Sequence, residues 1–303
     1  MRTEWAEGVD ALTELRERVD RLARGGPTPS CLPHLRCGRH TRPSGPHGST
    51  EESMVALIAL VLQGEKQSIL GSHSFSYGTG DVLVASMKAP LIGRITRASA
   101  REPFLAVGLG VRPSLVASLL WAAPDVKLGA TPLAITTGRA SEELLDAFRR
   151  YTRLADAPND IPVLAESIER EILWRVMQSP QGATLRSIGI ANSSVARISR
   201  AIDLLQQRFA EPLRTAELAR AAHMSEPTFC RHFRKTTAMS PLQFQKLLRL
   251  QEARARLLVE GRDVTSVSFE VGYQSPSQFS REYRRQFGVP PAEDAARGRR
   301  QGR

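Results

Sequence analysis

The chain has 303 residues, of which 41% are hydrophobic, and a formal net charge of +11. This length and apolar content suffice for two domains of ordinary size with packed cores. No apolar run is long enough to span a bilayer, and the sequence lacks the apolar segment of a secretion signal, so we expect a cytoplasmic protein. The three cysteines, Cys31, Cys37 and Cys230, cannot form a disulfide framework and fit a reducing compartment.

The positive charge is concentrated towards the C-terminus. Residues 191–303 contain 20 Lys and Arg against 11 Asp and Glu, a net charge of +9. Residues 1–190 contain 22 against 20, a net charge of +2. Because basic surfaces attract phosphate backbones or anionic membranes, an anionic partner is expected at the C-terminal part.

Residues 1–112 predict a helix followed by strands. The charged stretch from Met1 to Arg24 has helical apolar spacing, and the remainder of residues 1–50, rich in Pro, Gly and Arg, is expected to be flexible or irregular. Strands are expected at residues 55–62, 68–70, 74–77, 82–85 and 105–109, separated by Gly71, Gly78, Gly80 and Pro90. Short strands at this spacing predict a small antiparallel barrel or sandwich.

Residues 113–180 are predicted to be helical. Ser141 is the expected N-cap of a helix whose apolar residues are Leu144, Leu145, Phe148 and Tyr151. A second apolar stripe is formed by Val163, Leu164, Ile168, Ile172 and Val176. Such helices can cover a barrel or also pair with a second copy of the chain, and both arrangements have the same apolar pattern. Residues 181–194 are expected to form a linker.

A helix-turn-helix unit is predicted at residues 215–236. The first helix spans about Thr215 to Ala222, a tight turn follows at residues 223–225, and Ser225 is the expected N-cap of the second helix. Phe229 and Phe233 lie four residues apart and are expected to face the core. The cationic side chains then point outward, as this motif requires; they are Arg231, Arg234 and Lys235.

The same pattern recurs at residues 264–285, with a turn at residues 272–274 and a second helix from Pro276. Five positions recur in register. Phe279, Arg281, Tyr283, Arg284 and Arg285 lie fifty positions after Phe229, Arg231, Phe233, Arg234 and Lys235. Two matched units at this spacing are a strong indication of a DNA-binding protein.

The connecting segment predicts a rigid spacer between the two units. Ser240 and Pro241 are expected to start a helix and Gly261 to end it. Twenty residues lie between this start and this end, and a helix of twenty residues measures about 30 Å. Successive major grooves on one face of DNA lie roughly 34 Å apart. One chain could therefore place its two second helices in neighbouring grooves and cover two turns of DNA.

Residues 198–291 resemble the DNA-binding domain of the AraC/XylS family of transcription regulators. The residues that carry the resemblance are Phe269, Gly272, Tyr273, Phe279, Ser280, Arg281, Tyr283, Phe287, Gly288, Pro290 and Pro291. The resemblance implies a seven-helix domain, with base contacts from outward residues of the two second helices. By position these are Pro227, Cys230 and Arg231 in the first unit and Ser277, Gln278 and Arg281 in the second.

Chemistry refines this set of contacts. Pro227 and Cys230 are poor hydrogen-bonding groups, so Thr228 is added to the base-contact set. Arg231 and Arg281 are the strongest candidates, because Arg can donate two hydrogen bonds to guanine; the alternative for both is phosphate contact, which accounts for half or more of protein–DNA contacts. Phosphate contact or solvated charge is expected for Arg234, Lys235, Arg284 and Arg285.

Residues 51–180 resemble the ligand-binding domain of one branch of the same family. The residues that carry this resemblance are Leu62, Gln63, Gly64, Glu65, Lys66, Gly71, Tyr77, Gly78, Gly80, Asp81, Ser86 and Pro90. It implies an α+β protein, in which a cupin-like β-barrel with covering helices is followed by an all-α domain of two helix-turn-helix units joined by a long helix. The barrel is expected to bind an effector or to set dimerisation.

The main alternatives are an enzyme, either a metal-dependent cupin or a DNA-repair fusion that uses Cys as acceptor, and a non-specific architectural DNA binder. A metal-dependent cupin needs several His residues and a carboxylate, and only His73 lies in the strand region. Four zinc-type ligands lie within ten residues, a spacing too tight for the usual paired sites, and a reactive thiol there is a further alternative; the four are Cys31, His34, Cys37 and His40. We expect no enzymatic activity, cofactor or bound metal.

The sequence therefore predicts a sequence-specific, effector-controlled transcription regulator of the bacterial cytoplasm and nucleoid. The expected partners are double-stranded promoter DNA, a small-molecule effector, a second copy of the chain and, for an activator, RNA polymerase, with no membrane partner. The expected organisation is an N-terminal helix and flexible segment (1–50), an effector or dimerisation domain (51–180), a linker (181–194), a DNA-binding domain (195–291) and a basic tail (292–303).

Overall fold

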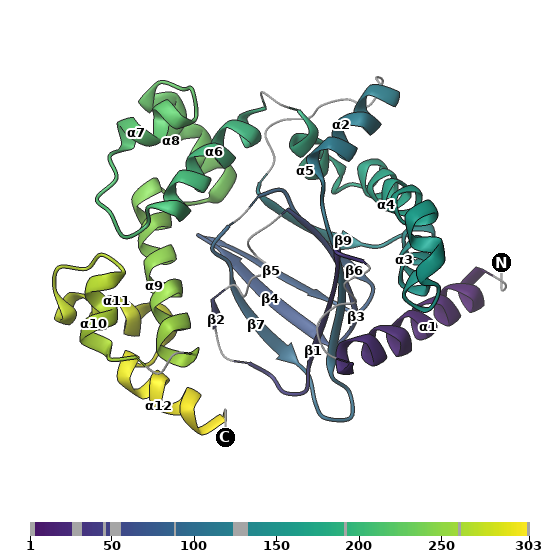
Figure 1. Ribbon diagram of the computed structural model, residues 1–303, viewed down its shortest axis with the longest axis horizontal. Helices are drawn as coiled ribbons and strands as arrows, with labels where there is room; N and C mark the ends of the chain where they lie inside the picture. The colour runs from purple at the N-terminus through teal and green to yellow at the C-terminus, as the bar shows by residue number, and fades with distance from the viewer. Residues whose placement is uncertain are drawn as a thin grey trace.

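The structure is a computed structural model that describes residues 4–25, 32–44, 47–48, 56–87, 89–123, 133–190, 193–259 and 262–301. The N-terminal half contains two antiparallel sheets with helices on one side, and the C-terminal half is all-helical (Figure 1). The predicted α+β fold class is therefore confirmed.

The strands of the described residues form two sheets. The first has the order β1 (Leu35–His40), β8 (Phe104–Gly110), β3 (Leu57–Gln63), β6 (Asp81–Ala85) and β9 (Ile135–Arg139). The second has the order β2 (His47–Gly48), β7 (Ile92–Arg97), β4 (Glu65–Leu70) and β5 (His73–Gly78). All neighbouring strands are antiparallel.

Strands β2 and β7 lie outside the predicted strand ranges, and so do β1 and β9, whose partner strands explain them. Strand β1 lies in the segment expected to be irregular, and it forms because it pairs with β8 along six residues. Strand β9 lies in the segment expected to be helical, where it pairs with β6 and forms an edge of the first sheet. Each strand has little apolar alternation of its own, since Leu35 and Ile135 are the fully buried residues in them. Partner strands distant in sequence impose these two strands.

The first sheet is apolar on both faces, which explains the unbroken apolar run in β3. Ile58, Leu60 and Leu62 face one core, whereas Val61 faces a second core on the other side of the sheet. The same alternation recurs in β6, where Val82 and Leu83 belong to different cores. One face therefore packs against helices, and the other faces the interior between the two sheets.

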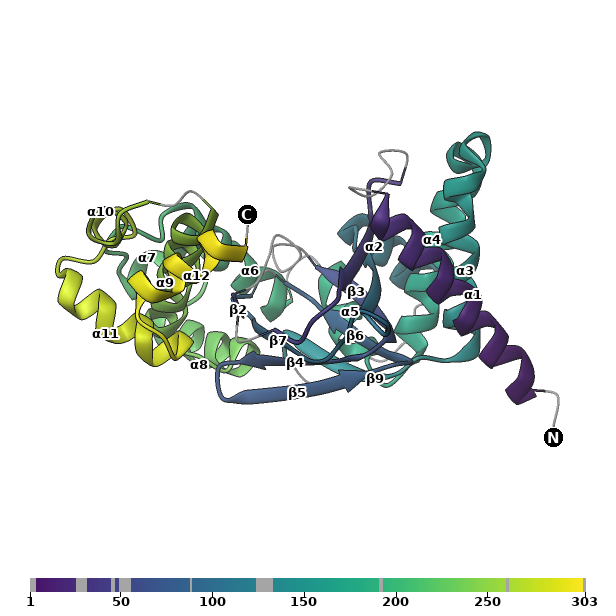
Figure 2. The ribbon, with the colours of Figure 1, turned by 90° about the horizontal axis from the view of Figure 1, so that it is seen from below.

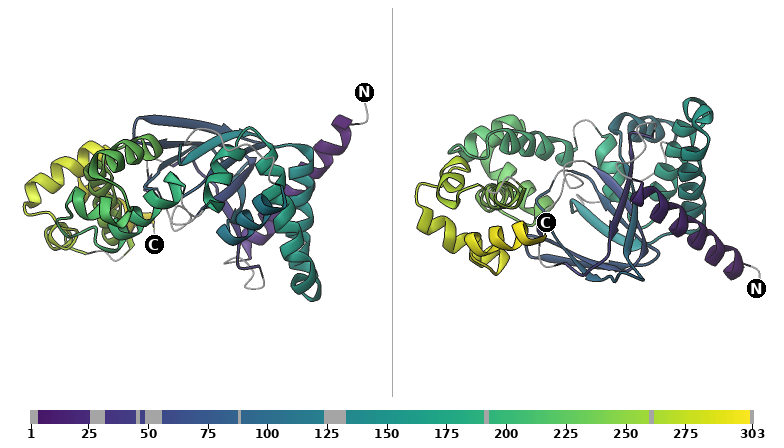
Figure 3. Two further views of the ribbon diagram at one scale, coloured as in Figure 1. Left: turned by 90° about the horizontal axis from the view of Figure 1, so that it is seen from above. Right: turned by 60° about the horizontal axis from the view of Figure 1, so that its bottom comes forward.

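In the described part of the N-terminal half, five α-helices cover the outer face of the first sheet (Figures 1 and 3). They are α1 (Glu4–Arg24), α2 (Pro113–Ala122), α3 (Glu142–Arg153), α4 (Ile161–Gln178) and α5 (Gly182–Gly189). Helix α1 packs Leu15 and Val19 into this core. Ser141 caps α3 as predicted, accepting a hydrogen bond from Leu144 N at 3.3 Å. Helix α5 occupies most of the segment for which we predicted a linker.

The apolar stripe predicted at residues 163–176 lies on α4, and only its later residues are buried. Ile168, Ile172 and Val176 are buried against the sheet-covering core, as the barrel-covering interpretation expects. Val163 is 73% exposed and Leu164 is 43% exposed. The exposed first turn leaves room for the pairing interpretation, which stays a prediction.

The C-terminal half consists of α6 (Ser194–Gln207), α7 (Thr215–Ala221), α8 (Glu226–Thr237), α9 (Pro241–Val259), α10 (Val264–Glu270), α11 (Pro276–Phe287) and α12 (Pro291–Gln301). Helices α7–α8 and α10–α11 form the two predicted helix-turn-helix units, and α9 joins them (Figure 1). Gly261, the predicted end of the connecting helix, lies outside the described residues.

Helix α12 shows that residues 292–301 of the predicted basic tail are helical. Its first turns are held to the second unit, because Asp294 accepts hydrogen bonds from Arg254 Nε at 2.7 Å and from Tyr283 O–H at 2.8 Å. Ala295 is also buried in the same core. The sequence prediction missed this helix because its anchors are single residues whose partners lie far away in the chain.

The two halves of the protein share one hydrophobic core. Val61, Leu83 and Phe104 from the sheets belong to the same buried cluster as Phe229 and Phe233 from α8. Ala134 N also donates a hydrogen bond to Thr236 O at 2.9 Å, and Gln251 Nε2 donates one to Leu91 O at 2.9 Å. The first helix-turn-helix unit is therefore packed directly on the two-sheet domain, which we call the barrel.

The internal repeat extends to backbone conformation. The residue after α8, Ala238, has a φ of 58°, and the residue fifty positions later, Gly288, has a φ of 80°. Both lie in the left-handed region and end their helices, but only glycine adopts this region without a steric penalty. The first unit therefore carries a strained residue where the second carries a relaxed one.

We expect Ala238→Gly to raise the free energy of unfolding by about 1 kcal/mol, because it relieves the left-handed strain. The reciprocal change, Gly288→Ala, should lower it by a similar amount, since no atom lies within 4 Å of the added methyl group. Urea unfolding of both variants measures these changes. A loss of stability in Ala238→Gly would contradict this view of the helix end.

Candidate nucleic-acid interface

Helix α8 separates an apolar face from a cationic face. Phe229 and Phe233 are fully buried, with ring centroids 5.3 Å apart. Arg231, Arg234 and Lys235 are exposed. The four-residue spacing of the two Phe residues fixes the helix on the core, so its opposite side presents the three cations to solvent.

The start of α8 presents the remaining predicted base-contact residues of the first unit. Ser225 is the N-cap, as predicted, but its hydroxyl donates to Thr228 Oγ1 at 3.0 Å and caps no backbone N–H. Pro227 and Cys230 are exposed. Thr228 Oγ1 still has its own proton to donate, which makes it the best hydrogen-bond donor of this first turn.

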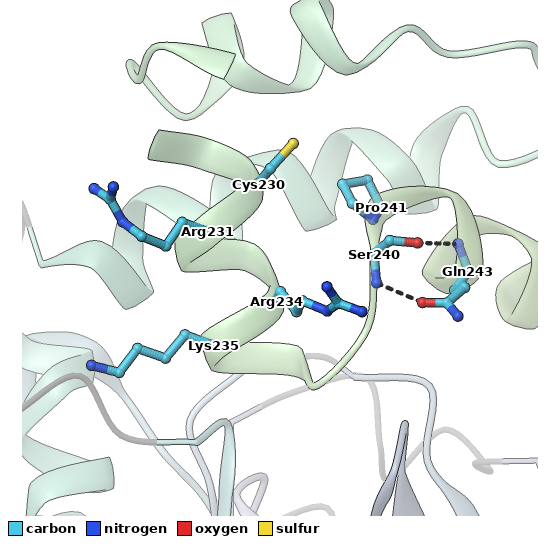
Figure 4. Close-up of a pocket in the computed structure, with 7 residues that line it drawn as sticks. All are labelled: Cys230, Arg231, Arg234, Lys235, Ser240, Pro241 and Gln243. Carbon is cyan, nitrogen blue, oxygen red and sulfur yellow. Dashed lines mark hydrogen bonds between the residues drawn. The ribbon is translucent and has the colours of Figure 1, made fainter. Parts of the chain in front are cut away.

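A hollow of about 780 Å³ lies between α8 and the start of α9 (Figure 4). It brings together four predicted DNA-contact residues with three residues that sequence reasoning did not include. The predicted residues are Cys230, Arg231, Arg234 and Lys235, and the added ones are Ser240, Pro241 and Gln243. The hollow therefore combines cationic side chains with the N-terminus of a helix.

Ser240 and Gln243 form a reciprocal cap at the start of α9. Gln243 N donates to Ser240 Oγ at 3.3 Å, and Ser240 N donates to Gln243 Oε1 at 2.9 Å (Figure 4). The Ser-x-x-Gln spacing is the sequence signature of a capping box, so the signal for these residues was present in the sequence. Figure 4 shows Arg234 pointing towards this cap, whereas Arg231 and Lys235 point away from it.

His232 lies on α8 among cations. Burial lowers the pKa of its imidazole, and the positive charges of Arg231, Lys235 and Arg197 lower it further. Its Nδ1 atom is buried without a hydrogen-bond partner. His232 is therefore neutral at physiological pH and contributes no charge to the cationic face.

Helix α11 repeats this division in the second unit. Phe279, Tyr283 and Phe287 are buried. The predicted contact residues of this unit are all exposed; they are Ser277, Gln278, Arg281, Arg284 and Arg285. Ser275 caps the helix by accepting a hydrogen bond from Gln278 N at 3.4 Å.

A second hollow of about 480 Å³ lies where both units meet the barrel. It places Arg234 of the first unit and Arg285 of the second beside Gly71 and Ser72 in the β4–β5 turn. A Cβ atom at Gly71 would lie 2.5 Å from Ala238 O, so the turn touches the end of α8 directly. Two predicted phosphate contacts therefore border the barrel.

Arg249 in α9 ties the two units to each other. Its guanidinium donates to Phe209 O at 2.7 Å, Ala210 O at 3.1 Å and Glu211 O at 3.0 Å, all in the loop after α6. It also donates to Gly272 O in the turn of the second unit, at 2.9 Å. Burial holds the pKa of Arg249 below its ordinary value, yet a guanidinium stays charged in proteins.

The turn of the second unit lies against the same loop. Gly272 has a φ of 88°, and a Cβ atom there would lie 2.1 Å from Ala210 O. Only glycine permits both this conformation and this close approach. Arg249, residues 209–211 and Gly272 thus form one contact, which we call the inter-unit junction.

Helices α8 and α11, each the second helix of its unit, lie on the same side of the helical half. Helix α9 has 19 residues, which corresponds to roughly 28 Å. Figure 2 shows α8 and α11 on one side of the helical half and α7 and α10 on the other. Neither α8 nor α11 is buried along its cationic face, so both can approach a flat or cylindrical anionic partner.

The second unit carries an ion pair that sequence reasoning did not find. Lys246 Nζ on α9 donates to Glu282 Oε1 on α11 at 2.9 Å. Burial alone would raise the pKa of Glu282, but hydrogen bonds from Lys246, Tyr273 and Gln278 outweigh it and hold that pKa below its ordinary value. The two partners are 36 positions apart and no local pattern links them.

The described residues give no support to a metal centre. They contain no group of three or more His, Cys, Asp and Glu side chains placed to hold an ion. Cys37 and His40 lie on strand β1, where residues three apart point to opposite faces, and Cys31 lies outside the described residues. No described helix has both the length and the apolar character needed to cross a membrane.

Two family models match the chain. The model described as the AraC-type transcriptional regulator N-terminus matches residues 31–184, just over half of the chain. The model described as a helix-turn-helix domain matches residues 218–297. The first covers the sheets and α2–α4 with the start of α5, and the second covers the first helix-turn-helix unit from Leu218 onward and the whole second unit.

Several curated proteins are similar to parts of the chain. The HTH-type transcriptional regulator ArgR of Pseudomonas aeruginosa is 30% identical over 142 residues, which are 46% of this chain and 42% of that protein. The HTH-type transcriptional activator RhaS of Yersinia pestis is 26% identical over 137 residues, which are 45% of this chain and 48% of that protein. The matched region spans less than half the length of these relatives.

The fold is similar to that of ToxT from Vibrio cholerae. A ToxT structure superposes with a TM-score of 0.53 at 11% sequence identity, covering 86% of this chain and 98% of that one. At this level of identity the likeness concerns the fold alone. It extends over both halves, the β-containing half as well as the helical one.

Loss of the inter-unit junction should destabilise the helical half. We expect Arg249→Met to lower the free energy of unfolding by about 3 kcal/mol, because the carbonyl groups lose a charged donor. Arg249→Lys keeps the charge but cannot reach all of these carbonyl groups at once, and it should lose less. Urea unfolding followed by circular dichroism measures both. An equal free energy of unfolding for wild type and Arg249→Met would show that the junction does not stabilise the protein.

Proposed function

The chain belongs to the AraC/XylS family of transcription regulators, and from this premise we propose that it binds promoter DNA in a sequence-specific manner and regulates transcription. The observation that carries the proposal is the pair of exposed cationic helices, α8 and α11, fixed on one side of a single connecting helix. A spacer of roughly 28 Å approaches the groove repeat of roughly 34 Å. One chain then contacts two consecutive major grooves.

We assign direct base contact to residues at the starts and centres of the two helices and phosphate contact to residues near their ends. The base-contact set is Pro227, Thr228, Cys230, Arg231, Ser277, Gln278 and Arg281. The phosphate-contact set is Arg234, Lys235, Arg284 and Arg285. Ser240 and Gln243 at the start of α9 add polar groups beside the first set.

The assignment predicts different defects for the two sets. Arg281→Ala should weaken binding to the preferred site by about 1–3 kcal/mol and relax the preference at one base position. Lys235→Ala should weaken binding to all sequences and reduce the salt slope by about one ion. Each variant serves as the control for the other in fluorescence-anisotropy titrations at several salt concentrations. Equal losses on preferred and random DNA for Arg281→Ala would assign that residue to phosphate.

We further propose that the N-terminal half controls DNA binding through its contact with α8. The support is the shared core and the approach of the β4–β5 turn to Ala238, beside Arg234 and Arg285. While the turn holds this position, the barrel occupies part of the space next to two phosphate-binding cations. ToxT has been solved bound to an unsaturated fatty acid, and an effector in the N-terminal half of this chain would act through the same contact.

Loosening this contact should strengthen DNA binding. Gly71→Ala pushes a methyl group into Ala238 O, so the barrel must move away from α8, and we expect affinity to rise about five-fold. Gly80→Ala is the matched control, because it places a left-handed residue (φ 83°) where the atoms nearest to the added methyl group belong to the flexible end of Arg139. Unchanged affinity in Gly71→Ala, or an equal rise in Gly80→Ala, would contradict control through this contact.

The remaining partners follow from the same proposal. A regulator of this kind acts in the bacterial cytoplasm, at the nucleoid, and an activator would contact RNA polymerase.

The exposed Val163 and Leu164 on α4 are the surface that we assign to pairing with a second copy of the chain. A double substitution to Ser that leaves the concentration dependence of the oligomeric state unchanged in analytical ultracentrifugation would contradict that assignment. We assign no enzymatic step to the protein.

A non-specific architectural binder is the competing function for the same surface. It would show little preference between a selected site and random DNA at physiological salt. The direct comparison is therefore the ratio of the two affinities, measured under one salt condition.

A further inference from the structure

Glu282 connects the interior of the second unit to a side chain on its outer surface. Its Oε1 atom accepts hydrogen bonds from Lys246 Nζ at 2.9 Å and from Gln278 Nε2 at 3.3 Å. Its Oε2 atom accepts one from Tyr273 O–H at 2.9 Å. The Glu282 side chain is only 13% exposed, whereas Gln278, one helical turn earlier on α11, is exposed.

This contact determines which way the amide of Gln278 faces. An ionised carboxylate only accepts hydrogen bonds, so the amide nitrogen must face Glu282 and the amide oxygen must face away. One N–H of Gln278 is used by Glu282. The amide therefore offers solvent its second N–H and its Oε1, which are one donor and one acceptor.

This donor–acceptor pair matches one base in the major groove. Adenine presents an acceptor, N7, next to a donor, N6–H₂. Guanine presents two acceptors, N7 and O6, and would need two donors from the same amide. Cytosine presents a donor, and thymine presents an acceptor beside a methyl group. Adenine is the base that uses both remaining groups of Gln278.

We propose that Glu282 is a positioning residue that presets Gln278 to read an adenine, and that this contact sets one base of the recognised sequence. The inference rests on the proposed function, since α11 must enter a major groove. Lys246 on α9 holds in place the Oε1 atom of Glu282 that Gln278 contacts. The first unit has Thr228 and His232 at the corresponding positions, fifty residues earlier, so its second helix has no equivalent pair.

The test is selection of preferred sites from a pool of random duplex DNA, with the full chain and its variants. The random region spans about 20 base pairs, two turns of DNA. The variants are Gln278→Ala, Glu282→Ala, the nearly isosteric Glu282→Gln, and Tyr273→Phe as the control that removes a hydrogen bond to Oε2 and leaves Oε1 untouched. Urea unfolding checks that each variant is folded.

We expect wild type to select adenine at a position where Gln278→Ala selects no base. At that position Glu282→Ala should accept guanine as well, so that the adenine-to-guanine ratio falls about ten-fold. Glu282→Gln should give a smaller fall, because its amide can face Gln278 with either group. Tyr273→Phe should retain the wild-type ratio, and preferences at the other positions should be unchanged in all variants.

Several results would overturn the inference while the proposed function stands. They are a Gln278→Ala profile identical to wild type, a wild-type preference for a base other than adenine at the Gln278 position, an unchanged ratio in both Glu282 variants, or a Glu282→Ala profile weakened equally at every position. Selection of no sequence by wild type would instead overturn the proposed function itself.

Discussion

The hydrogen bonds of Arg249 are the constraint on which the geometry of the helical half depends. The guanidinium lies on α9, between a loop of the first unit and the turn of the second, and donates to carbonyl groups of both. Gly272 completes the contact, since its missing side chain lets the second turn approach Ala210 O. A connecting helix alone would fix the distance between the units but not their relative rotation. The inter-unit junction fixes the rotation, so both cationic helices face the same side.

Under the proposed function, the contact between the two halves gives this rigid arrangement a means of control. The first unit shares its core with the barrel, while the second has a separate core around Phe279 and Tyr283. A displacement in the barrel therefore reaches α8 through the direct contacts of Gly71 and Thr236. Regulation of DNA binding by the N-terminal half needs no additional element, because the phosphate-contact candidates Arg234 and Arg285 already border the barrel.

Local sequence patterns predicted most of the helical half. They could not predict contacts between residues that lie far apart in the chain. The repeat of Phe229 and Phe233 at Phe279 and Tyr283 located both units, since helical spacing and turn residues are properties of adjacent positions. Strands β1, β7 and β9 were missed because distant partner strands create them, and α12 because single residues anchor it. In the candidate site, Ser240 and Gln243 had a readable capping signature. The Lys246–Glu282 pair and the carbonyl partners of Arg249 had none, because they arise only when α9 meets the loops around it.

Hydroxyl-radical footprinting on a selected site, combined with the stoichiometry of the complex, tests the central claim most directly. A single chain that spans two grooves should protect two segments on one face of the duplex, with centres about 10 base pairs apart, at one chain per site. Protection of a single groove, or protection of two grooves only when two chains are bound, would contradict the rigid two-unit arrangement.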